Sequence, residues 1–202
     1  MDYDIQDDIY CYKNTGVLKN KFNIRDKEKL ISLERDLTGL KLIEIETKRL
    51  GKVLDEKYFK AIHKFLLEEI LDWAGEYRKV RIHKDNTTFA YPENIKSELK
   101  RVFGELKDDN YLKDMDSDRL SERLAYYKAE FNIIHPFREG NGRTIRKFIE
   151  LLAEAAGHNL RFDMINKEEY LDIMRKSVLN ITDLKEYIKR QLDYEINNKN
   201  QE

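Results

Sequence analysis

The chain has 202 residues, a length that suits one domain, or one domain with a terminal elaboration. Its 38 basic and 39 acidic side chains nearly cancel, and a net charge of −1 does not predict the strong attraction to phosphate backbones that nucleic-acid binding needs. No apolar run approaches the roughly 20 residues that span a bilayer, and the acidic start lacks the basic and apolar regions of a signal peptide, so we expect a cytoplasmic protein.

The first part of the chain predicts an irregular arm followed by two helices. The arm covers residues 1–25 and holds the only cysteine, Cys11, which can form neither an internal disulfide nor a thiolate metal cage and is expected near the surface. Apolar residues recur at helical spacing from Asp26 to about Leu50 and from about Glu56 to Trp73, where Gly75 ends the pattern. The expected buried faces are Leu30, Leu33, Leu37, Leu40 and Ile43 in the first helix, and Phe59, Ile62, Leu66, Ile70 and Trp73 in the second.

One β-hairpin is predicted at about residues 77–91. Tyr77–Ile82 alternates apolar and basic residues, Thr87–Tyr91 is a second β-prone run, and turn-forming residues lie between them. Pro92 suits the first turn of a helix that continues to Leu106.

The second half predicts four further elements of helical structure. Ser117 is a candidate N-cap for a helix through Phe131, which Pro136 ends. A helix from Asn141 to Gly157 follows, then one capped by Asn166 with Glu169 that runs to about Leu179, and a last one capped by Thr182. The fold class is therefore mainly α: a single helical domain at residues 26–196 with one short hairpin, and a polar tail at 197–202.

Residues 135–146 concentrate the groups that phosphate chemistry needs. They read His-Pro-Phe-Arg-Glu-Gly-Asn-Gly-Arg-Thr-Ile-Arg. Two glycines beside Asn141 allow close backbone approach at a helix start, whose unpaired N–H groups favour an anion. Arg143 and Arg146 add two guanidinium groups on one helix face, Glu139 supplies a carboxylate for Mg²⁺, and His135 is a base that is neutral near pH 7.

Each of these features has an ordinary structural alternative. Gly-Asn-Gly alone is a common turn, a histidine before a helix is usually a hydrogen-bonded structural residue, and helical arginines are usually solvated. His63, on the second predicted helix, is expected to be such a structural histidine. The combination within twelve residues favours a site for phosphoryl-type chemistry, which depends on ordered groups.

The segment resembles the Fic family signature HPFx[D/E]GNGRxxR and matches it at every specified position. Tyr12–Lys21 resembles the N-terminal arm of bacterial Fic proteins, Trp73-Ala74-Gly75 with the hairpin resembles the family's flap, and Met164–Leu192 resembles its closing helices. The resemblance implies a Fic-type domain over nearly the whole chain.

The resemblance also implies an activity: transfer of AMP from ATP, with Mg²⁺, to a Ser, Thr or Tyr hydroxyl of a target protein. His135 would then deprotonate the hydroxyl, and Glu139 would hold Mg²⁺. The remaining roles would fall to a packing anchor and to phosphate ligands: Pro136 and Phe137 beneath the loop, Gly140, Asn141 and Gly142 at the α-phosphate, and Arg143 and Arg146 at the β- and γ-phosphates.

Partners are implied in the same way. The hairpin would be a flap that pairs with an extended target segment, with Ile82, Lys84 and Phe89 as candidate contacts; an exposed turn lysine and a core aromatic are the alternatives for the last two. Some similar stand-alone Fic toxins modify type II topoisomerases, which makes such an enzyme a candidate target. The family's inhibitory pattern [S/T]xxxE[G/N] is nearly matched only at Thr182 and Glu186, so we expect a separate small antitoxin to supply the inhibitory glutamate.

Two rival functions remain open from the sequence. A Doc-like protein kinase shares the family but departs from Gly-Asn-Gly in its loop, whereas this chain keeps Gly140-Asn141-Gly142. A catalytically silent nucleotide-binding module would need neither His135 nor Glu139. Other nucleotides or phosphocholine are alternative donors.

Overall fold

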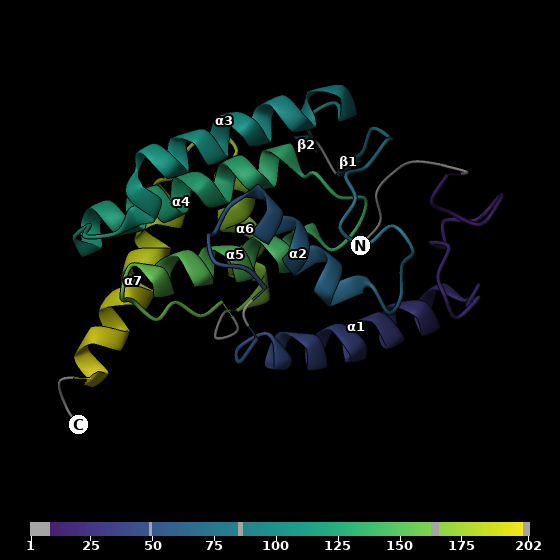
Figure 1. The fold of residues 1–202 in the computed structure, drawn as a ribbon, viewed down its shortest axis with the longest axis horizontal. Helices are drawn as coiled ribbons and strands as arrows, with labels where there is room; N and C mark the ends of the chain where they lie inside the picture. The colour runs from purple at the N-terminus through teal and green to yellow at the C-terminus, as the bar shows by residue number, and fades with distance from the viewer. Residues whose placement is uncertain (1–8, 49, 85–86, 163–165, 200–202) are drawn as a thin grey trace. The chain divides into compact units, whose positions relative to one another are not determined.

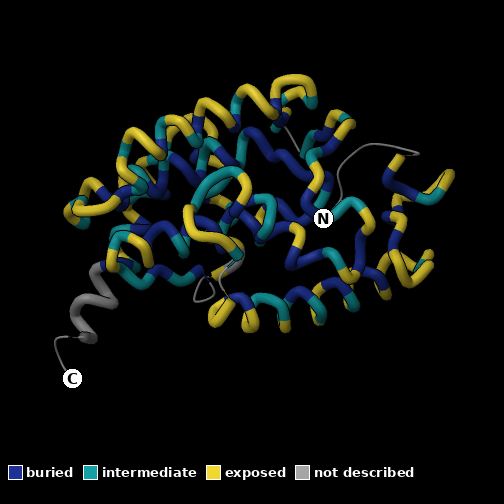
Figure 2. The backbone as a smooth tube through the Cα atoms, in the orientation of Figure 1, coloured by how far each residue is buried: buried dark blue, intermediate teal, exposed yellow. Residues whose placement is uncertain are grey.

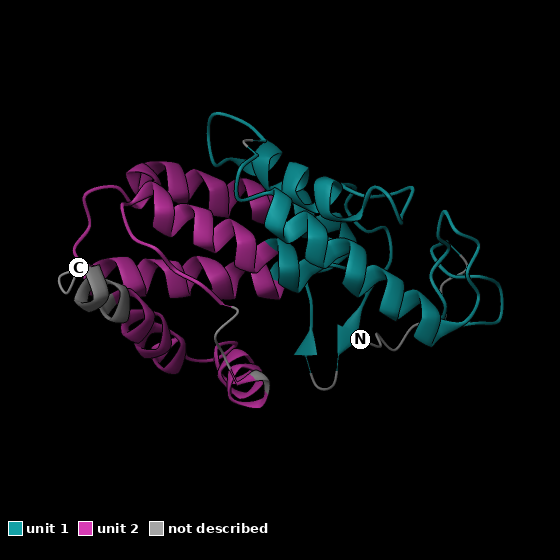
Figure 3. Ribbon diagram, turned by 90° about the horizontal axis from the view of Figure 1, so that it is seen from below, with its two compact units in different colours: residues 1–96, 134–144 teal, residues 97–133, 145–202 magenta. Residues whose placement is uncertain are grey.

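The computed structural model describes residues 9–48, 50–84, 87–162 and 166–199 (Figure 1). These residues form seven α-helices, two 3₁₀ turns and one two-stranded antiparallel hairpin, which confirms the mainly α prediction. The chain divides into two compact units, residues 1–96 with 134–144 (unit 1) and residues 97–133 with 145–202 (unit 2) (Figure 3). The single-domain boundaries 26–196 stay a prediction.

Unit 1 is built on two helices with acidic N-caps. Helix α1 (Lys27–Glu44) begins after Asp26, whose carboxylate accepts the Lys29 N–H, and α2 (Glu56–Leu67) begins after Asp55, which accepts the Tyr58 N–H at 2.9 Å. Both helices end several residues earlier than predicted, at Glu44 and Leu67. The two helices pack on each other, and the Lys41 ammonium lies 2.8 Å from the Glu69 carboxylate just beyond α2.

The buried face of α1 differs from the predicted one. Leu40 and Ile43 were expected in the core but are 66% and 71% exposed, whereas Glu34 and Thr38 are buried beside Leu30. The apolar periodicity of α1 predicts that its leucine and isoleucine side chains face the core. In the structure Glu34 and Thr38 are buried there instead, and both contact Arg143 at the end of the loop. In Figure 2 the exposed and buried residues alternate along this helix.

The hairpin is shorter than predicted, and its first strand lies later in the chain. Strand β1 is His83–Lys84 and pairs with β2 (Thr87–Thr88), so that His83 lies opposite Thr88. The prediction of a strand at residues 77–82 is wrong, because the polar groups of this segment bond to the loop at 134–136 instead of to a strand. The middle of the predicted turn, residues 85–86, lies outside the described residues.

Unit 2 contains most of α3 (Ile95–Asp108) and all of α4 (Ser117–Ile134) except its last residue. Helix α3 follows a 3₁₀ turn at Pro92–Asn94. A second 3₁₀ turn, Asn110–Leu112, separates them. Ser117 is the first helical residue and not the N-cap, since the Asp116 carboxylate accepts the Arg119 N–H at 2.9 Å.

The later helices agree more closely with the sequence. Helix α5 (Asn141–Ala155) begins in unit 1 and continues into unit 2, and Gly157 follows it with φ +88°, as expected of a C′ glycine. Asn166 caps α6 (Lys167–Lys176) by accepting the N–H groups of Glu168 and Glu169. Helix α7 (Thr182–Lys199) starts at Thr182 itself, so this residue lies within the first turn and does not cap it.

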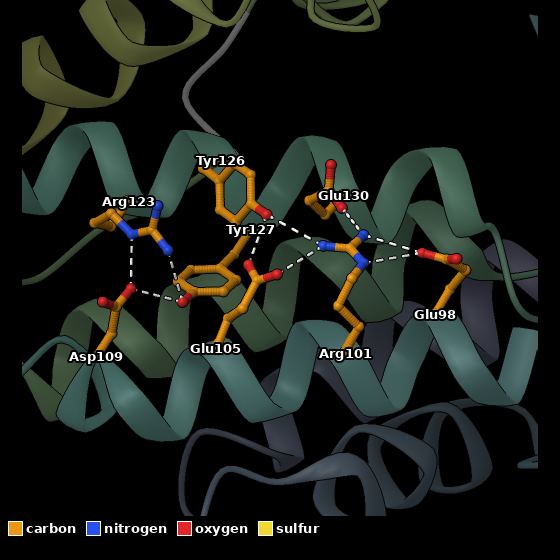
Figure 4. A network of polar contacts seen from close by, with 8 residues as sticks. All are labelled: Glu98, Arg101, Glu105, Asp109, Arg123, Tyr126, Tyr127 and Glu130. Carbon is orange, nitrogen blue, oxygen red and sulfur yellow. Dashed lines mark hydrogen bonds and ion pairs between the residues drawn. The ribbon is translucent and has the colours of Figure 1, made fainter.

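Aromatic packing and polar contacts join the helices of unit 2. Phe103, Phe131 and Phe148, from α3, α4 and α5, pack with ring centroids 5.2–5.7 Å apart. Figure 4 shows a polar network along α3 and α4, in which Arg101 bonds to carboxylates of both helices and Arg123 lies 2.6 Å from Asp109. This network is partly exposed, so we assign it to the pairing of these two helices and not to chemistry.

Two expectations from composition can be compared with the structure. Cys11 is only 2% exposed, so the expected position near the surface is wrong; its Sγ lies 3.7 Å from Nη2 of Arg138 in the interior of unit 1. Among the described residues, no helix combines the length and apolarity that crossing a bilayer requires.

Candidate active site

The loop after α4 closes on itself through the side chain of Asn141. Its Oδ1 accepts the Phe137 N–H at 2.9 Å, and its Nδ2 donates to the Phe137 carbonyl at 2.7 Å. Asn141 is 1% exposed and is also the first residue of α5. The resemblance assigns this residue to a phosphate, and that role stays a prediction; in the structure its amide fixes the loop that precedes the helix.

Phe137 and His63 form the floor beneath this loop. The two rings stack with centroids 3.8 Å apart, and both residues are fully buried. His63 Nδ1 accepts the Gly75 N–H at 2.8 Å, so its Nε2 carries the hydrogen that is donated to the Glu139 carbonyl at 2.9 Å. Burial lowers the pKa of His63 to about 4, and the neutral ring acts as a fixed bridge between α2 and the loop.

Gly140 is required by this close packing. Its φ is +76°, and a Cβ at this position would lie 2.4 Å from Cδ1 of Leu67. The Gly140 carbonyl accepts the Thr144 N–H at 3.1 Å, the first hydrogen bond of α5. The N–H groups of Asn141, Gly142 and Arg143 therefore belong to the first turn, which has no intrahelical acceptors for them and favours an anion.

His135 is held from both its ring and its backbone. Its ring stacks on Phe89 of the hairpin with centroids 3.9 Å apart, and its φ is +47°, a conformation that is uncommon for a side-chain-bearing residue. Its carbonyl accepts Nε of Arg78 at 2.8 Å. A strained backbone held by surrounding contacts is frequent at functional sites, and it fixes where this imidazole lies.

Arg78 holds the backbone around the loop in place, and the sequence analysis missed it. It is 2% exposed, and its guanidinium donates to the carbonyls of Ile134 and His135 on the loop and of Val80 and Ala90 beside the hairpin. Its own N–H donates to the Pro136 carbonyl at 2.9 Å. No local pattern in the sequence marks an arginine that serves five carbonyls from three separate places in the chain, so nothing distinguished it from the neighbouring basic residues.

The charged groups of the loop are coupled to α1. Arg143 forms an ion pair with Glu34 and donates to Oγ1 of Thr38 at 3.1 Å. Burial raises the pKa of the Glu139 carboxyl, and the charge of Glu34 raises it further, whereas Arg143 and the Gly140 N–H lower it. Glu139 is half-buried and accepts that N–H at 3.0 Å. Because the charge of Glu34 acts on the Glu139 carboxylate, an added positive charge would be favourable here.

A divalent metal fits these residues only together with another ligand. Among the described residues, no group of three or more His, Cys, Asp or Glu side chains is placed to hold a metal. Mg²⁺ commonly binds through one or two carboxylates plus substrate phosphates and water. The raised pKa of Glu139 and its proximity to Glu34 therefore fit a cation that arrives with phosphate.

The remaining predicted residues lie as follows. Arg146 is half-buried in the part of α5 that belongs to unit 2, with its guanidinium carbon 5.9 Å from the Tyr170 ring centroid. Ile82 and Phe89 are buried, and Lys84 is half-buried in β1. Glu186 is exposed on α7 and forms no ion pair with Arg146 among the described contacts.

The fold and the loop together describe a mainly helical protein in which a histidine precedes a helix start that favours an anion. A model of the Fic/DOC family matches residues 53–153, and the chain belongs to this family. The match includes α2, the hairpin, α3, α4 and most of α5.

Known relatives extend the similarity beyond the matched region. The chain is 34% identical to the protein adenylyltransferase VbhT of Bartonella schoenbuchensis over 90% of its own length, and spans 38% of that relative. It is also 34% identical to the probable protein adenylyltransferase Fic of Escherichia coli, over 81% of this chain and 80% of that one. The crystal structure of the BepC protein of Bartonella tribocorum with bound AMPPNP superposes with a TM-score of 0.83 at 28% identity, over 91% of this chain and 95% of that one.

Proposed function

We propose that this chain is a protein adenylyltransferase that transfers AMP from ATP to a hydroxyl side chain of a target protein. The observation that carries the proposal is the arrangement of residues 135–143: a histidine in a fixed conformation, a carboxylate with a raised pKa, and the free first turn of α5. Relatives that cover most of the chain are named protein adenylyltransferases, and a structural neighbour binds an ATP analogue. These findings support a nucleotide substrate.

In the proposed reaction His135 is the general base. It accepts the proton of the incoming hydroxyl as the oxygen forms a bond to the α-phosphorus, and the bond from that phosphorus to the bridging oxygen breaks. Pyrophosphate leaves with the electron pair. The stacking of His135 on Phe89 and the bond from Arg78 keep the imidazole from rotating away, and a positioned base typically contributes roughly 10²–10⁴-fold in rate.

The remaining groups of residues 135–146 are assigned to the phosphates of ATP. The backbone N–H groups of Gly142 and Arg143 are available to the α-phosphate, while Asn141 and Gly140 keep the first turn of α5 in place. Arg143 and Arg146 are assigned to the β- and γ-phosphates. Glu139 would hold Mg²⁺, which when bound neutralises charge on the phosphates.

The target is a protein that presents a Ser, Thr or Tyr hydroxyl on an extended segment. Strands β1 and β2 form a two-stranded hairpin next to the Phe89–His135 stack, which supports main-chain pairing between the hairpin and that segment. A type II topoisomerase is one candidate target. A cytoplasmic location agrees with the use of ATP.

Regulation by a separate antitoxin belongs to the same proposal. The near match Thr182–Glu186 lies on α7 with Glu186 exposed, and no described contact joins Glu186 to an arginine of the motif. An inhibitory glutamate would therefore come from a partner protein. If the isolated chain is inert and the variant Glu186→Gly becomes active, inhibition is internal and the antitoxin proposal is wrong.

A labelling experiment tests the activity. The purified chain is added to a lysate of its source cell with Mg²⁺ and ATP that is radiolabelled at either the α- or the γ-phosphate. We expect a labelled protein band with the α-label only, its loss in His135→Ala, and its retention in the control His158→Ala, which changes a histidine in unit 2. A band with the γ-label identifies a Doc-like kinase, and equal α-label from wild type and His135→Ala refutes catalysis by His135.

A further inference from the structure

The segment that leads into the hairpin carries two positive charges on its outer face. Lys79 and Arg81 are exposed, whereas Val80 is half-buried and Ile82 is only 2% exposed. Successive side chains of an extended segment point to opposite sides, and the exposure alternates here in that way. The two charged side chains therefore lie on one face, which we call the basic strip (Lys79 and Arg81).

The basic strip has no carboxylate partner among the described residues. The described part of residues 77–91 contains no Asp or Glu, and no ion pair joins Lys79 or Arg81 to any other carboxylate that the structure describes. In contrast, the Lys41 ammonium of the same unit lies 2.8 Å from the Glu69 carboxylate. The charge of the strip therefore remains available to an acidic partner.

Contacts within unit 1 hold both residues of the strip. The Lys79 N–H donates to the Tyr10 hydroxyl at 3.1 Å. The Arg81 guanidinium lies over the Tyr91 ring, with its central carbon 4.2 Å from the ring centroid. This contact restricts the Arg81 side chain, so that less entropy is lost when the guanidinium pairs with a carboxylate.

The strip adjoins the contacts that fix the proposed base. Arg78, the residue before Lys79, donates to the His135 carbonyl at 2.8 Å, and Phe89 stacks on the His135 ring with centroids 3.9 Å apart. A target segment with its hydroxyl at His135 therefore has neighbouring residues near the strip, because each residue of an extended chain adds about 3.3 Å. The charge of those neighbouring residues is what the strip can distinguish.

We propose that the basic strip selects target segments that carry Asp or Glu beside the acceptor hydroxyl, so that the preferred substrate is an acidic protein segment. This inference rests on the proposed function, because it names the kind of target for the same site. Main-chain pairing with the hairpin does not depend on side chains, and charge complementarity at the strip supplies a selectivity that such pairing lacks. Segments rich in Lys or Arg are repelled by the same two charges.

Charge selection of this kind is modest for each ion pair. An exposed pair changes affinity by up to about fivefold, so two such pairs together give up to roughly twentyfold. The Debye length falls from about 10 Å at 0.1 M salt to about 3 Å at 1 M, so the selection should weaken as salt is added.

One alternative is that Lys79 and Arg81 are ordinary solvated residues, which would leave the target unselected by charge. Another is that the strip attracts every polyanion, nucleic acid included. The net charge of −1 gives the chain no general attraction for polyanions, which favours a local contact with a protein segment.

The test is binding of fluorescent peptides to the full chain, measured by anisotropy without ATP. The peptides have equal length and a central tyrosine, serine or threonine, and they are flanked on both sides by aspartate, by the isosteric asparagine or by lysine. The variant Lys79→Glu with Arg81→Glu reverses the charge of the strip. Lys29→Glu with Arg35→Glu is the matched control, because it reverses one exposed lysine and one exposed arginine on α1 of the same unit.

We expect the aspartate peptides to bind the wild type about tenfold more tightly than the asparagine peptides, and the reversed strip to favour the lysine peptides. The control should keep the wild-type order. Thermal melting shows whether each variant is folded; if the reversed strip does not fold, Lys79→Gln with Arg81→Gln replaces it and should show no preference.

Three results overturn the proposal. The first is equal affinity of the wild type for the aspartate and asparagine peptides, failure of both to bind included. The second is the same loss of preference in the control as in the reversed strip. The third is an oligonucleotide that binds as tightly as the aspartate peptides and depends on the same two residues, because the strip would then respond to charge alone.

Transfer to the same peptides from ATP labelled at the α-phosphate separates this inference from the activity. In the reversed strip the KM for ATP should change less than about twofold, since the strip is assigned to the target and not to the nucleotide. Strip-dependent binding of aspartate peptides without any label transfer would leave the basic strip standing and remove the adenylyltransferase. Transfer that ignores the flanking charge would remove the strip and leave the adenylyltransferase standing.

Discussion

Arg78 offers the most direct test of how the site is held together. Its buried guanidinium donates to four carbonyls, of Ile134, His135, Val80 and Ala90. Arg78→Met retains most of the volume and removes all four donors. The variant therefore disconnects the loop from the hairpin without creating a large cavity.

The size of the effect follows from the bonds that are lost. Each buried acceptor that loses its partner costs about 1–3 kcal/mol, and water that reaches the partly buried carbonyls of Val80 and Ala90 reduces this cost. The variant also removes the buried charge of Arg78, whose desolvation is unfavourable, and this offsets a further part of the lost stability. We expect a net loss of about 3 kcal/mol of unfolding free energy, or roughly 6–12 °C in melting temperature for a chain of this size.

The assay is urea unfolding at pH 7 together with thermal melting. Arg81→Met is the matched control, because Arg81 is exposed and only covers the Tyr91 ring at 4.2 Å, so its loss should cost about 0.5–1 kcal/mol. Arg78→Lys keeps the charge but cannot serve four carbonyls, and it should reduce AMP transfer by roughly tenfold or more by releasing His135. A loss below about 1 kcal/mol in Arg78→Met, equal to that of the control, would refute this account.

Three further predictions concern residues around the loop. The pKa of His63 is about 4 in the folded state and 6.5 in the unfolded state, so the unfolded state binds the proton more readily. The free energy of unfolding should therefore be at its full value above pH 6.5 and fall by about 3 kcal/mol as the pH is lowered to 4. Urea titrations should show a smaller fall in the variant His63→Gln. Gly140→Ala should lose about 3 kcal/mol through its positive φ and its close neighbours, measured by urea unfolding, whereas the helical control Gly104→Ala, with nothing within 4 Å, should gain up to about 1 kcal/mol. Glu34→Ala should lose about 2 kcal/mol, and a double-mutant cycle with Arg143→Met should return a coupling of at least about 1 kcal/mol; additive losses would exclude the ion pair as their cause.

Secondary structure followed from the sequence wherever a local cause acts. Capping by Asn166 and the left-handed glycine at Gly157 are set by neighbouring residues and were readable from the chain alone. The hairpin was found, but its first strand was placed too early. The segment after Gly75 pairs with residues 134–136, and no local pattern reports a partner almost sixty residues away.

The candidate site was also predictable from the sequence only in part. The motif gave the groups of the loop because they are contiguous, but it could not show which groups already have partners. Asn141 and Arg143 were both expected at phosphates, and the structure occupies the first with the Phe137 backbone and the second with Glu34. Glu34 itself lies on a helix face that apolar periodicity did not select.

The two arginines of the motif therefore stand in opposite electrostatic settings. Arg143 has a carboxylate partner in α1, so a phosphate that binds it must compete with Glu34 or share the guanidinium with it. Arg146 has no carboxylate partner among the described residues and is accompanied by a second cation, Lys128, which makes an added anion favourable. Since a guanidinium that is already neutralised gains less from a phosphate than one that is not, most of the attraction for the leaving diphosphate should come from Arg146. Arg143 also ties the start of α5 to α1 through Glu34, and its charge lowers the pKa of Glu139 against the raising effects of burial and of Glu34.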